Sequence, residues 1–462
     1  AFNCSSPQNL LAKVVYSQAS GSGPFQLAAG ANHYRLLGLE ISRAPGTGMI
    51  GNLISASSGT ADHIVLDRVW MHGSPQDDTM AGLAMSRMTY VAMVDSYATD
   101  FHCTAVTGGC TDAHVISGGT STTADGVWRI TGNFLEASGE NILYGGGAAT
   151  TTPADIEIRQ NHFFKPLTWM SGQPGFVGGS SGNPFIVKNL LELKNAQRVL
   201  IEGNIFENSW GGFSQSGYAI LLTPKNQAVS ATSNVCPICA VMDVTIRYNT
   251  ISHVGAGISL ADILSDNGGA ALAGQRYSIH DITIDDVSVS KYIGSGTLLM
   301  VFSGWSTSAM NNVIVNHITG FPDAGSRIMD LGNSVSNPPM YAFAMTNSIL
   351  GQSQYPIWST GGTSNCAFPD VPLTSLTACF TNYSFKGNAI IATNNSNYPP
   401  TKWPTGNYFP TTAAAVQFVN FNGGNGGDYH LISGSPYSNA ASDGKDLGAD
   451  INTIQSLTAG VY

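Results

Sequence analysis

The segment from Gly139 to Asn226 collects charged and aromatic side chains that could act on a sugar polymer. It carries four of the nine lysines of the chain, several glutamates and two tryptophans. Lysines would neutralise the carboxylates of an acidic glycan, and indole rings would stack on pyranose faces. This composition therefore suits a groove for an acidic polysaccharide.

Two reactions fit such a groove. In β-elimination, a lysine of lowered pKa removes the proton α to a neutralised carboxylate. The candidate bases are Lys165, Lys194 and Lys225. In hydrolysis, two carboxylates flank the glycosidic bond and one acts as the acid. The candidate carboxylates are Glu140, Glu192 and Glu207, with Asp262 further along the chain. Spacing along the sequence leaves the choice between the reactions open.

Other side chains of this region are candidates for binding the substrate. They are Trp169, Trp210, Lys188, Arg198 and His253. Each also has a structural interpretation. The basic residues could form a solvated strand edge that blocks aggregation, and the tryptophans could be packing residues. Glu192 and Lys194, two residues apart, could be a simple surface pair.

The elements that position these residues follow from a repeated phrase: an apolar residue, two variable residues, then asparagine. The repeated asparagines are Asn133, Asn161, Asn204, Asn249, Asn316 and Asn347, and a variant occurs at Ile284–Val287. The intervals of about 28 to 45 residues are typical of solenoid repeats. We expect the asparagines to stack at one bend of every coil as a hydrogen-bonded ladder.

Each phrase includes a short β-branched strand, and a second apolar strand lies between copies, as in Leu190–Leu193 and Ala219–Leu222. No helical period accompanies them. The sequence therefore predicts an all-β chain, a single-stranded right-handed parallel β-helix. In-register stacking would bring one outward-pointing residue from each coil side by side in a column. Most neighbours in this column carry opposite charges. The column comprises Thr131, Arg159, Glu202, Arg247 and Asp285.

Composition limits the partners of the chain. Its net charge is −10 and only 10% of its residues are charged, which argues against nucleic acid and anionic membranes. No stretch approaches the roughly 18–20 apolar residues of a membrane span. The start at Ala1 is that expected of a processed, secreted protein.

Six of the seven cysteines form three sequence-local pairs. We expect disulfides between Cys103 and Cys110, between Cys236 and Cys239, and between Cys366 and Cys379. Such bonds suit an extracellular or cell-surface location. Cys236 and Cys239 could instead be half of a zinc site or a redox motif, although a second such pair is missing. Cys4 is left over and could link two chains.

Three regions are expected: an N-terminal segment or cap over 1–32, the parallel β-helix over 33–363, and the last irregular coils with a C-terminal cap over 364–462. A solenoid needs its open ends covered. Asp443, Asp446 and Asp450 could hold calcium in the cap, but we expect a hydrogen-bonded turn there. No other metal or cofactor is expected.

Several segments resemble a known group of proteins. They are Asp155–Trp169, Leu191–Trp210, Leu222–Gln227, Gly139–Tyr144 and Asp443–Asp450. They are similar to a group of secreted bacterial right-handed β-helix proteins within the pectate-lyase-like superfamily. The resemblance runs from about His33 to the C-terminus and implies a secreted β-helix. Members of the superfamily often cleave polysaccharides, but no reaction is implied for this group.

The sequence thus favours a secreted polysaccharide-active protein, a lyase or a glycoside hydrolase. Low charge and stackable β ends fit a different class, a non-catalytic surface, filament or adhesin protein that assembles with itself. A carbohydrate-binding module without turnover is a third hypothesis. Polysaccharide is the expected partner in the first and third.

Overall fold

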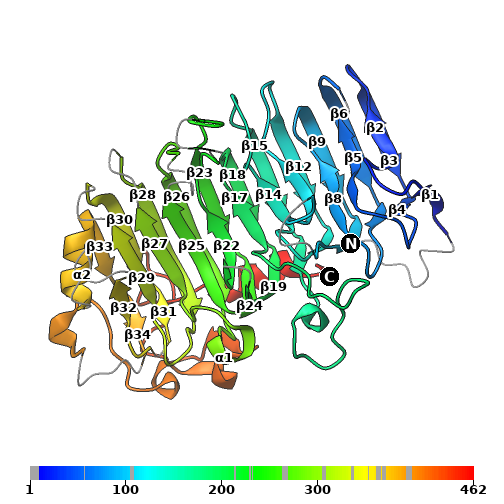
Figure 1. Ribbon diagram of the computed structural model, residues 1–462. Coiled ribbons are helices and arrows are strands. Elements are labelled where there is room, and N and C mark those ends of the chain that lie inside the picture. The colour runs from blue at the N-terminus through cyan, green and yellow to red at the C-terminus, as the bar shows by residue number, and fades with distance from the viewer. Residues whose placement is uncertain are drawn as a thin grey trace.

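The computed structural model describes residues 10–461 except 57, 105–108, 213–214, 228–229, 231–232, 263–268, 304–307, 334–337, 352, 360–365, 367–370 and 392–397. The chain winds as a single-stranded right-handed parallel β-helix, as predicted (Figure 1). Each coil passes through three faces, of which two belong to one bent 21-stranded sheet and the third is an 11-stranded parallel sheet. We call these the first, second and third faces, in the order in which a coil visits them.

The first face consists of β3 (Asn32–Leu37), β6 (Ala61–Asp67), β9 (Met88–Val94), β12 (Gly126–Thr131), β15 (Ala154–Arg159), β18 (Ala196–Glu202), β23 (Val241–Arg247), β26 (Gln275–Ile284), β28 (Asn311–Gly320), β30 (Met340–Thr346) and β33 (Phe380–Lys386). The second face consists of β1 (Ala12–Tyr16), β4 (Leu39–Arg43), β7 (Trp70–His72), β10 (Tyr97–Phe101), β13 (Phe134–Ala137), β16 (His162–Phe164), β19 (Ile205–Ser209), β24 (Thr250–Val254), the ends of β26 and β28, β31 (Ile349–Leu350) and β34 (Ala389–Ile390). The third face consists of β2 (Phe25–Leu27), β5 (Ile50–Ala56), β8 (Thr79–Ala84), β11 (His114–Gly118), β14 (Ile142–Tyr144), β17 (Leu191–Leu193), β22 (Tyr218–Leu222), β25 (Ala256–Asp262), β27 (Leu299–Ser303), β29 (Met329–Asn333) and β32 (Ile357–Ser359).

The interior of the coils is a stack of aliphatic and aromatic side chains. Ile130, Ile158, Ile201 and Ile246 lie in register on neighbouring strands of the first face, and all are fully buried. Burying each such side chain contributes about 1.5–3 kcal/mol, so every added coil extends one continuous core.

A sharp corner joins the first and second faces in every coil. Its first residue has a left-handed backbone, with φ between 47° and 74°. These residues are Gly38, Arg68, Asp95, Gly132, Gln160, Gly203, Tyr248, Asp281, His317, Asn347 and Gly387. The next residue points inward, and in four consecutive coils it is an asparagine of the repeated phrase. The left-handed bend therefore places the ladder asparagines at the corner.

The asparagine ladder is confirmed for Asn133, Asn161, Asn204 and Asn249. The side-chain oxygen of Asn204 accepts hydrogen bonds from the backbone nitrogen of Asn161 at 2.9 Å and from its side-chain nitrogen at 3.0 Å. The same two bonds join Asn133 to Asn161 and Asn204 to Asn249. Buried amide groups are thus satisfied along the stack.

Asn316 and Asn347 are hydrogen-bonded to each other, with 3.0 Å between Asn347 Nδ2 and Asn316 Oδ1, but the prediction was wrong in placing them at the ladder position. Asn316 pairs with Thr346 in the outward column, and Asn347 is the left-handed corner residue of its coil. The register aligns Val315 and Met345 with the earlier apolar anchors, so Ile318 and Ser348 occupy the ladder position. The ladder resumes from Ser348 to Asn388 and Asn407. Side chains along a strand alternate between inward and outward with a period of two residues. The apolar pattern therefore fits equally well when the register shifts by two residues.

The outward charged column is confirmed where Glu202 lies between Arg159 and Arg247. Glu202 forms ion pairs with both arginines, and its side chain is 5% exposed. The prediction for Asp285 was wrong, because His280 stands beside Arg247 in this column. Asp285 lies beyond the end of β26, where Tyr429 and Gly426 donate hydrogen bonds to its carboxylate.

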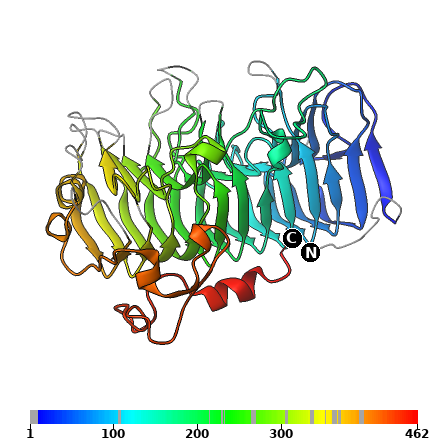
Figure 2. The ribbon, with the colours of Figure 1, turned by 90° about the horizontal axis from the view of Figure 1, so that it is seen from below.

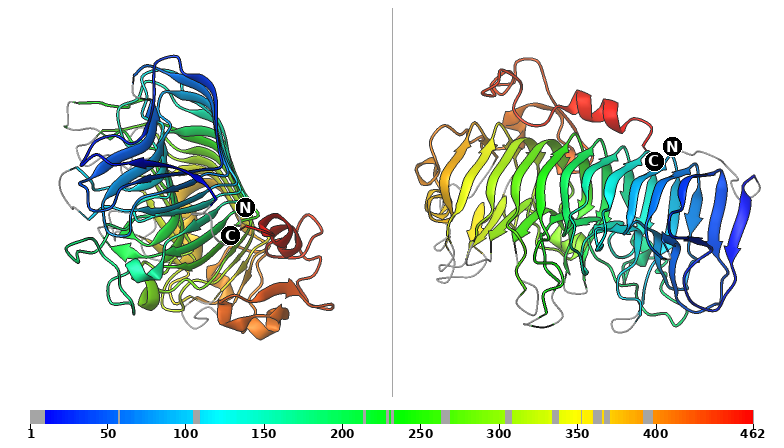
Figure 3. Two further views of the ribbon diagram at one scale, coloured as in Figure 1. Left: turned by 90° about the vertical axis from the view of Figure 1, so that its right-hand side faces the viewer. Right: turned by 90° about the horizontal axis from the view of Figure 1, so that it is seen from above.

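The C-terminal segment lies along the outside of the coils beside the corner between the first and second faces (Figures 2 and 3). It contains the antiparallel pair β35 (Phe418–Asn420) and β36 (Asp428–Leu431), and α3 (Ile451–Thr458). His317 donates a hydrogen bond from Nδ1 to the oxygen of Gly448 at 2.8 Å, and Gln160 donates to the oxygen of Leu457 at 3.2 Å. The remaining α-helices are α1 (Val289–Tyr292) and α2 (Pro372–Cys379).

All three predicted disulfides are confirmed: Cys103–Cys110, Cys236–Cys239 and Cys366–Cys379. The zinc alternative for Cys236 and Cys239 therefore falls away, because both sulfur atoms are taken up in the disulfide. Cys4 lies outside the described residues. Within the described chain, every helix is too short or too polar to cross a membrane.

Candidate active site

Three of the predicted catalytic residues, Glu140, Glu192 and Lys194, gather in one recessed place beside the third face. We call this set the recessed cluster; it consists of Asp112, His114, Glu140, Lys188, Glu192 and Lys194. Lys194 Nζ lies 3.5 Å from Glu192 Oε2, and His114 Nδ1 lies 3.4 Å from Glu140 Oε2. Lys188 forms an ion pair with Asp112. Glu140, Glu192 and Lys194 were predicted as catalytic candidates and Lys188 as a binding candidate, whereas nothing in the sequence pointed to Asp112 or His114.

Burial dominates the electrostatics of the recessed cluster. It raises the pKa of Glu192 to about 7, against the attraction of Lys194, and lowers the pKa of His114 to about 4. The side chain of Glu140 is 1% exposed and that of Glu192 is 7% exposed. Two lysines and three carboxyl groups therefore compensate one another out of contact with most of the solvent.

Asp112, His114 and Glu140 each offer a metal-ligand atom, and these atoms lie within 4.8 Å of one another. Lys188 and Lys194, however, already supply positive charge at this place. Since an ion would have to share the carboxylates with two ammonium groups, the donor set fits a charge-compensated cluster better than a metal centre.

Lys165 points into the coil rather than outward and is fully buried. Its Nζ donates to the backbone oxygen of Ala137 at 2.7 Å, to the side-chain oxygen of Asn141 at 3.1 Å and to the backbone oxygen of Asn189 at 3.2 Å. It also donates to the oxygen of Gly139. Burial lowers the pKa of Lys165 to about 7, against the attraction of Glu140 and Glu136. A surface-bound polymer cannot reach this ammonium group.

A second, open cluster lies on the outer side of the second face. We call it the open row; it consists of His162, Glu207, His253 and Asp286. Glu207 Oε2 lies 2.9 Å from His162 Nε2, and Glu207 Oε1 lies 3.4 Å from His253 Nδ1. His253 Nε2 lies 3.7 Å from Asp286 Oδ2. Adjacent strands β16, β19 and β24 position the first three side chains, so the row runs along the helix axis.

Hydrogen bonds set the charges of the open row. Those from His162 and His253 lower the pKa of Glu207 to about 2, so this carboxylate is ionised at any ordinary pH. The hydrogen bond to Glu207 raises the pKa of His253 above its usual value, against the opposing effect of burial. The side chain of His253 is 36% exposed. Its Nε2 lies too far from Asp286 for a hydrogen bond, so it can exchange a proton with a bound molecule.

The predicted tryptophans lie beside the open row. Trp169 and Trp210 line a cavity of about 690 Å³ together with Phe185, Met170 and Ile293. Tyr292 packs against the same apolar cluster and donates a hydrogen bond to Asp286 Oδ2 at 2.7 Å. This tyrosine joins the cavity to the open row.

Aromatic rings continue the open row toward the N-terminal coils. Trp70, Tyr97, Phe134 and His162 occupy equivalent places on β7, β10, β13 and β16. The rings of Tyr97 and Phe134 are stacked with centroids 4.5 Å apart, and Tyr97 is 36% exposed. Figure 2 shows this part of the second face between the C-terminal segment and the loops that precede the third face.

Arg198 and Asp262 lie apart from both clusters, whereas Lys225 adjoins the recessed cluster. Arg198 forms an exposed ion pair with Asp155 on the first face. Lys225 donates its backbone N–H to the oxygen of Lys194 at 3.2 Å. Asp262 is buried, and its carboxylate accepts a hydrogen bond from the backbone of Gly274 at 3.0 Å. In the C-terminal segment, Asp443, Asp446 and Asp450 accept hydrogen bonds from Lys445, Asn439 and Thr453.

Sequence reasoning gave no catalytic role to His162, Asp286 or Tyr292. A signal for His162 existed, because it follows Asn161 and its coil neighbour Glu207 stands three residues after Asn204. Asp286 and Tyr292 follow a coil that lacks the ladder asparagine, so the repeat did not align them with the others.

No protein-family model and no curated protein matches the chain. The solved structures that are similar to it include two alginate lyases. One is described as the structure of the PL6 family alginate lyase AlyGC, with 11% identity, a TM-score of 0.42, and coverage of 96% of this chain and 56% of that one. The other is described as a new PL6 alginate lyase in complex with a trisaccharide, with 10% identity, a TM-score of 0.43, and coverage of 96% and 88%. The chain thus spans little more than half the length of the first.

Proposed function

We propose that the protein is a secreted polysaccharide-active enzyme that cleaves an acidic glycan along the second face, by β-elimination. The observation that carries this proposal is the contact of Glu207 with His162 and His253 at the end of a row of aromatic rings. The rings offer flat faces on which sugars can stack. The three disulfides support secretion.

His253 is the proposed base. The neutral ring would take the proton α to the uronate carboxylate through Nε2, and its electron pair would form a carbon–carbon double bond. The bond to the leaving glycosidic oxygen would break, and that oxygen would take a proton from the imidazolium. Glu207 orients the ring and increases its basicity, as carboxylates do for catalytic histidines. The ammonium group of Lys291, whose side chain is 52% exposed, would pair with the substrate carboxylate.

Hydrolysis by two carboxylates is the less favoured reaction. It needs one carboxylic acid that is still protonated near the working pH. Glu207 is fully ionised there, and Asp286 already accepts hydrogen bonds from Lys291 and Tyr292. The open row therefore offers a histidine, rather than a carboxylic acid, as the group that exchanges protons.

A panel of uronate-containing and neutral polysaccharides tests the proposal. We expect unsaturated products that absorb near 235 nm from at least one acidic polymer, with wild type and not with His253→Gln. New reducing ends without this absorbance would overturn β-elimination in favour of hydrolysis. Neither signal from any polymer, with binding retained, would overturn enzymatic activity and leave a binding protein.

A further inference from the structure

The outer surface of the first face carries a column of residues with left-handed backbone, one in each coil. It begins with His33, His63 and Tyr90 and continues with Val127 and Asp155. The left-handed backbone turns each of these side chains outward, and strand pairing fixes the spacing between them. The first two members place two imidazoles side by side at the N-terminal end of the helix.

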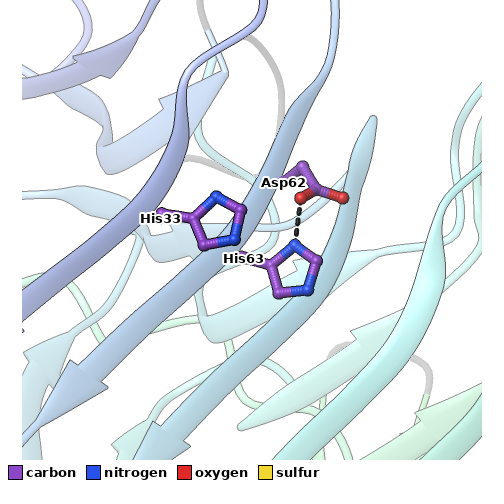
Figure 4. Close-up of side chains that lie close together, drawn as sticks. All are labelled: His33, Asp62 and His63. Carbon is purple, nitrogen blue, oxygen red and sulfur yellow. Dashed lines mark hydrogen bonds and ion pairs between the residues drawn. The ribbon is translucent and has the colours of Figure 1, made fainter.

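The two imidazole rings are stacked. Their centroids lie 4.6 Å apart with 6° between the ring planes, and Tyr90 continues the stack at 4.6 Å from His63. Figure 4 shows His33 and His63 side by side, with Asp62 at the edge of the His63 ring. Ligand atoms of His33, Asp62 and His63 lie within 4.8 Å of one another, and both histidines are exposed.

Each ring is held by a hydrogen bond through Nδ1. His33 Nδ1 donates to Asn32 Oδ1 at 3.0 Å, and His63 Nδ1 contacts Asp62 Oδ1. The other Asp62 oxygen accepts a hydrogen bond from Thr89 at 2.9 Å, which fixes the carboxylate. A neutral imidazole that donates through Nδ1 carries its lone pair on Nε2. This is the tautomer found in metal-binding histidines, which usually donate the other N–H to an oxygen acceptor.

We propose that His33 and His63, with Asp62 beside them, bind a divalent transition-metal ion that prefers imidazole, such as Zn²⁺, Ni²⁺ or Cu²⁺. Both imidazoles are exposed, so rotation of the stacked rings would turn the two Nε2 atoms toward a shared ion, and solvent would complete the coordination. Asp62 orients His63 and contributes negative charge. This site lies on a different face from the open row and is independent of the proposed function.

Metal binding here joins two coils. His33 belongs to β3 and His63 to β6, which are successive strands of the first face. An ion held by both histidines binds only the coiled state, so it stabilises the N-terminal coils by mass action. The melting temperature should therefore rise with the ion concentration.

Calorimetric titration of the untagged full chain with ZnCl₂ tests the site. His33→Asn and His63→Asn are suitable variants, because asparagine tolerates a left-handed backbone. We expect one Zn²⁺ per chain in wild type, an affinity loss of at least 10-fold in either variant, and loss of the Zn²⁺-dependent rise in melting temperature.

Two further variants serve as controls. His430→Asn removes a histidine that makes the same kind of Nδ1 contact, with Asp428, and should leave Zn²⁺ binding unchanged. His114→Asn tests the recessed cluster as the source of binding. Zn²⁺ affinity unchanged in His33→Asn and His63→Asn would overturn the proposal, as would affinity lost only in His114→Asn or no binding by wild type.

Discussion

The recessed cluster and the open row contain the same kinds of side chain in different surroundings. In the recessed cluster, burial is the largest influence on Glu192 and His114, and it favours the uncharged form of each. In the open row, hydrogen bonds are the largest influence on Glu207 and His253, and they favour the charged forms. The same residue types therefore acquire opposite protonation behaviour.

This difference is why we propose a structural role for the recessed cluster and a catalytic role for the open row. In the recessed cluster Lys188 pairs with Asp112 and Lys194 pairs with Glu192. Lys165 next to them satisfies four oxygen acceptors inside the coil. In the open row, charged side chains surround the exposed ring of His253, which lies beside aromatic side chains. Buried charges that are neutralised by opposite charges maintain the folded structure. An exposed histidine beside a fixed carboxylate can transfer protons.

Replacement of one carboxylate by an amide should distinguish the roles of the two clusters most clearly, through its effect on kcat. Glu207→Gln should lower kcat by about 10³-fold, because His253 loses the carboxylate that orients it and raises its pKa. Glu192→Gln should change kcat less than threefold. Steady-state rates on the cleaved polymer measure both. Equal losses in the two variants would contradict the assignment of catalysis to the open row.

Removal of the buried ammonium group of Lys165 should affect stability, whereas removal of an exposed cation should not. Lys165→Met should lower the free energy of unfolding by about 3 kcal/mol, since four buried oxygen atoms lose their donor. Arg198→Met, which breaks an exposed ion pair on the first face, should leave the unfolding midpoint unchanged within error. Denaturant unfolding followed by circular dichroism measures both. A stable, fully active Lys165→Met protein would show that the interior position is not required.

The pH dependence of activity should follow His253. Its pKa lies above the usual value in the folded protein, so kcat should rise with pH through that raised pKa as the ring becomes neutral. The stabilisation from charged His253 is fully present below its unfolded pKa, near 6.5, and is lost as pH rises through the folded value. Glu207→Gln should shift the rising limb of the activity profile to lower pH, because the hydrogen bond that raises the pKa is gone. An unshifted limb would place the proton transfer on another group.

The smallest expected effect concerns the aromatic row. Tyr97→Ala should raise KM several-fold, about 1 kcal/mol, without changing kcat, because it removes one stacking ring away from the reacting atoms. Tyr341, which is half exposed on the first face, provides the matched control as Tyr341→Ala. Kinetics over a range of polymer concentrations measure both variants. A KM change in the control alone would place the substrate on the first face.

The repeated phrase predicted the stacking of the coils correctly wherever its asparagine is present. Asn161, Asn204 and Asn249 stack as predicted, and Glu202 lies between two arginines. Prediction failed from β26 onward, where isoleucine replaces asparagine at the corner and alternation no longer distinguishes one register from another. Hydrogen-bonding groups specify a unique register, but an apolar alternation alone does not.

For the candidate site, the sequence determined only part of which residues come close to one another, as for Glu207 and His253 on successive coils. Equal spacing from successive asparagines puts side chains on neighbouring coils, and local cysteine pairs close the loops between them. Only the tertiary structure decided which residues are buried and which are exposed. One residue of shift along a strand turns a side chain from solvent to core, so Lys165 lies inside while His162, three residues earlier, lies outside. Long loops also determined exposure, because their path over the coils cannot be inferred from the repeat.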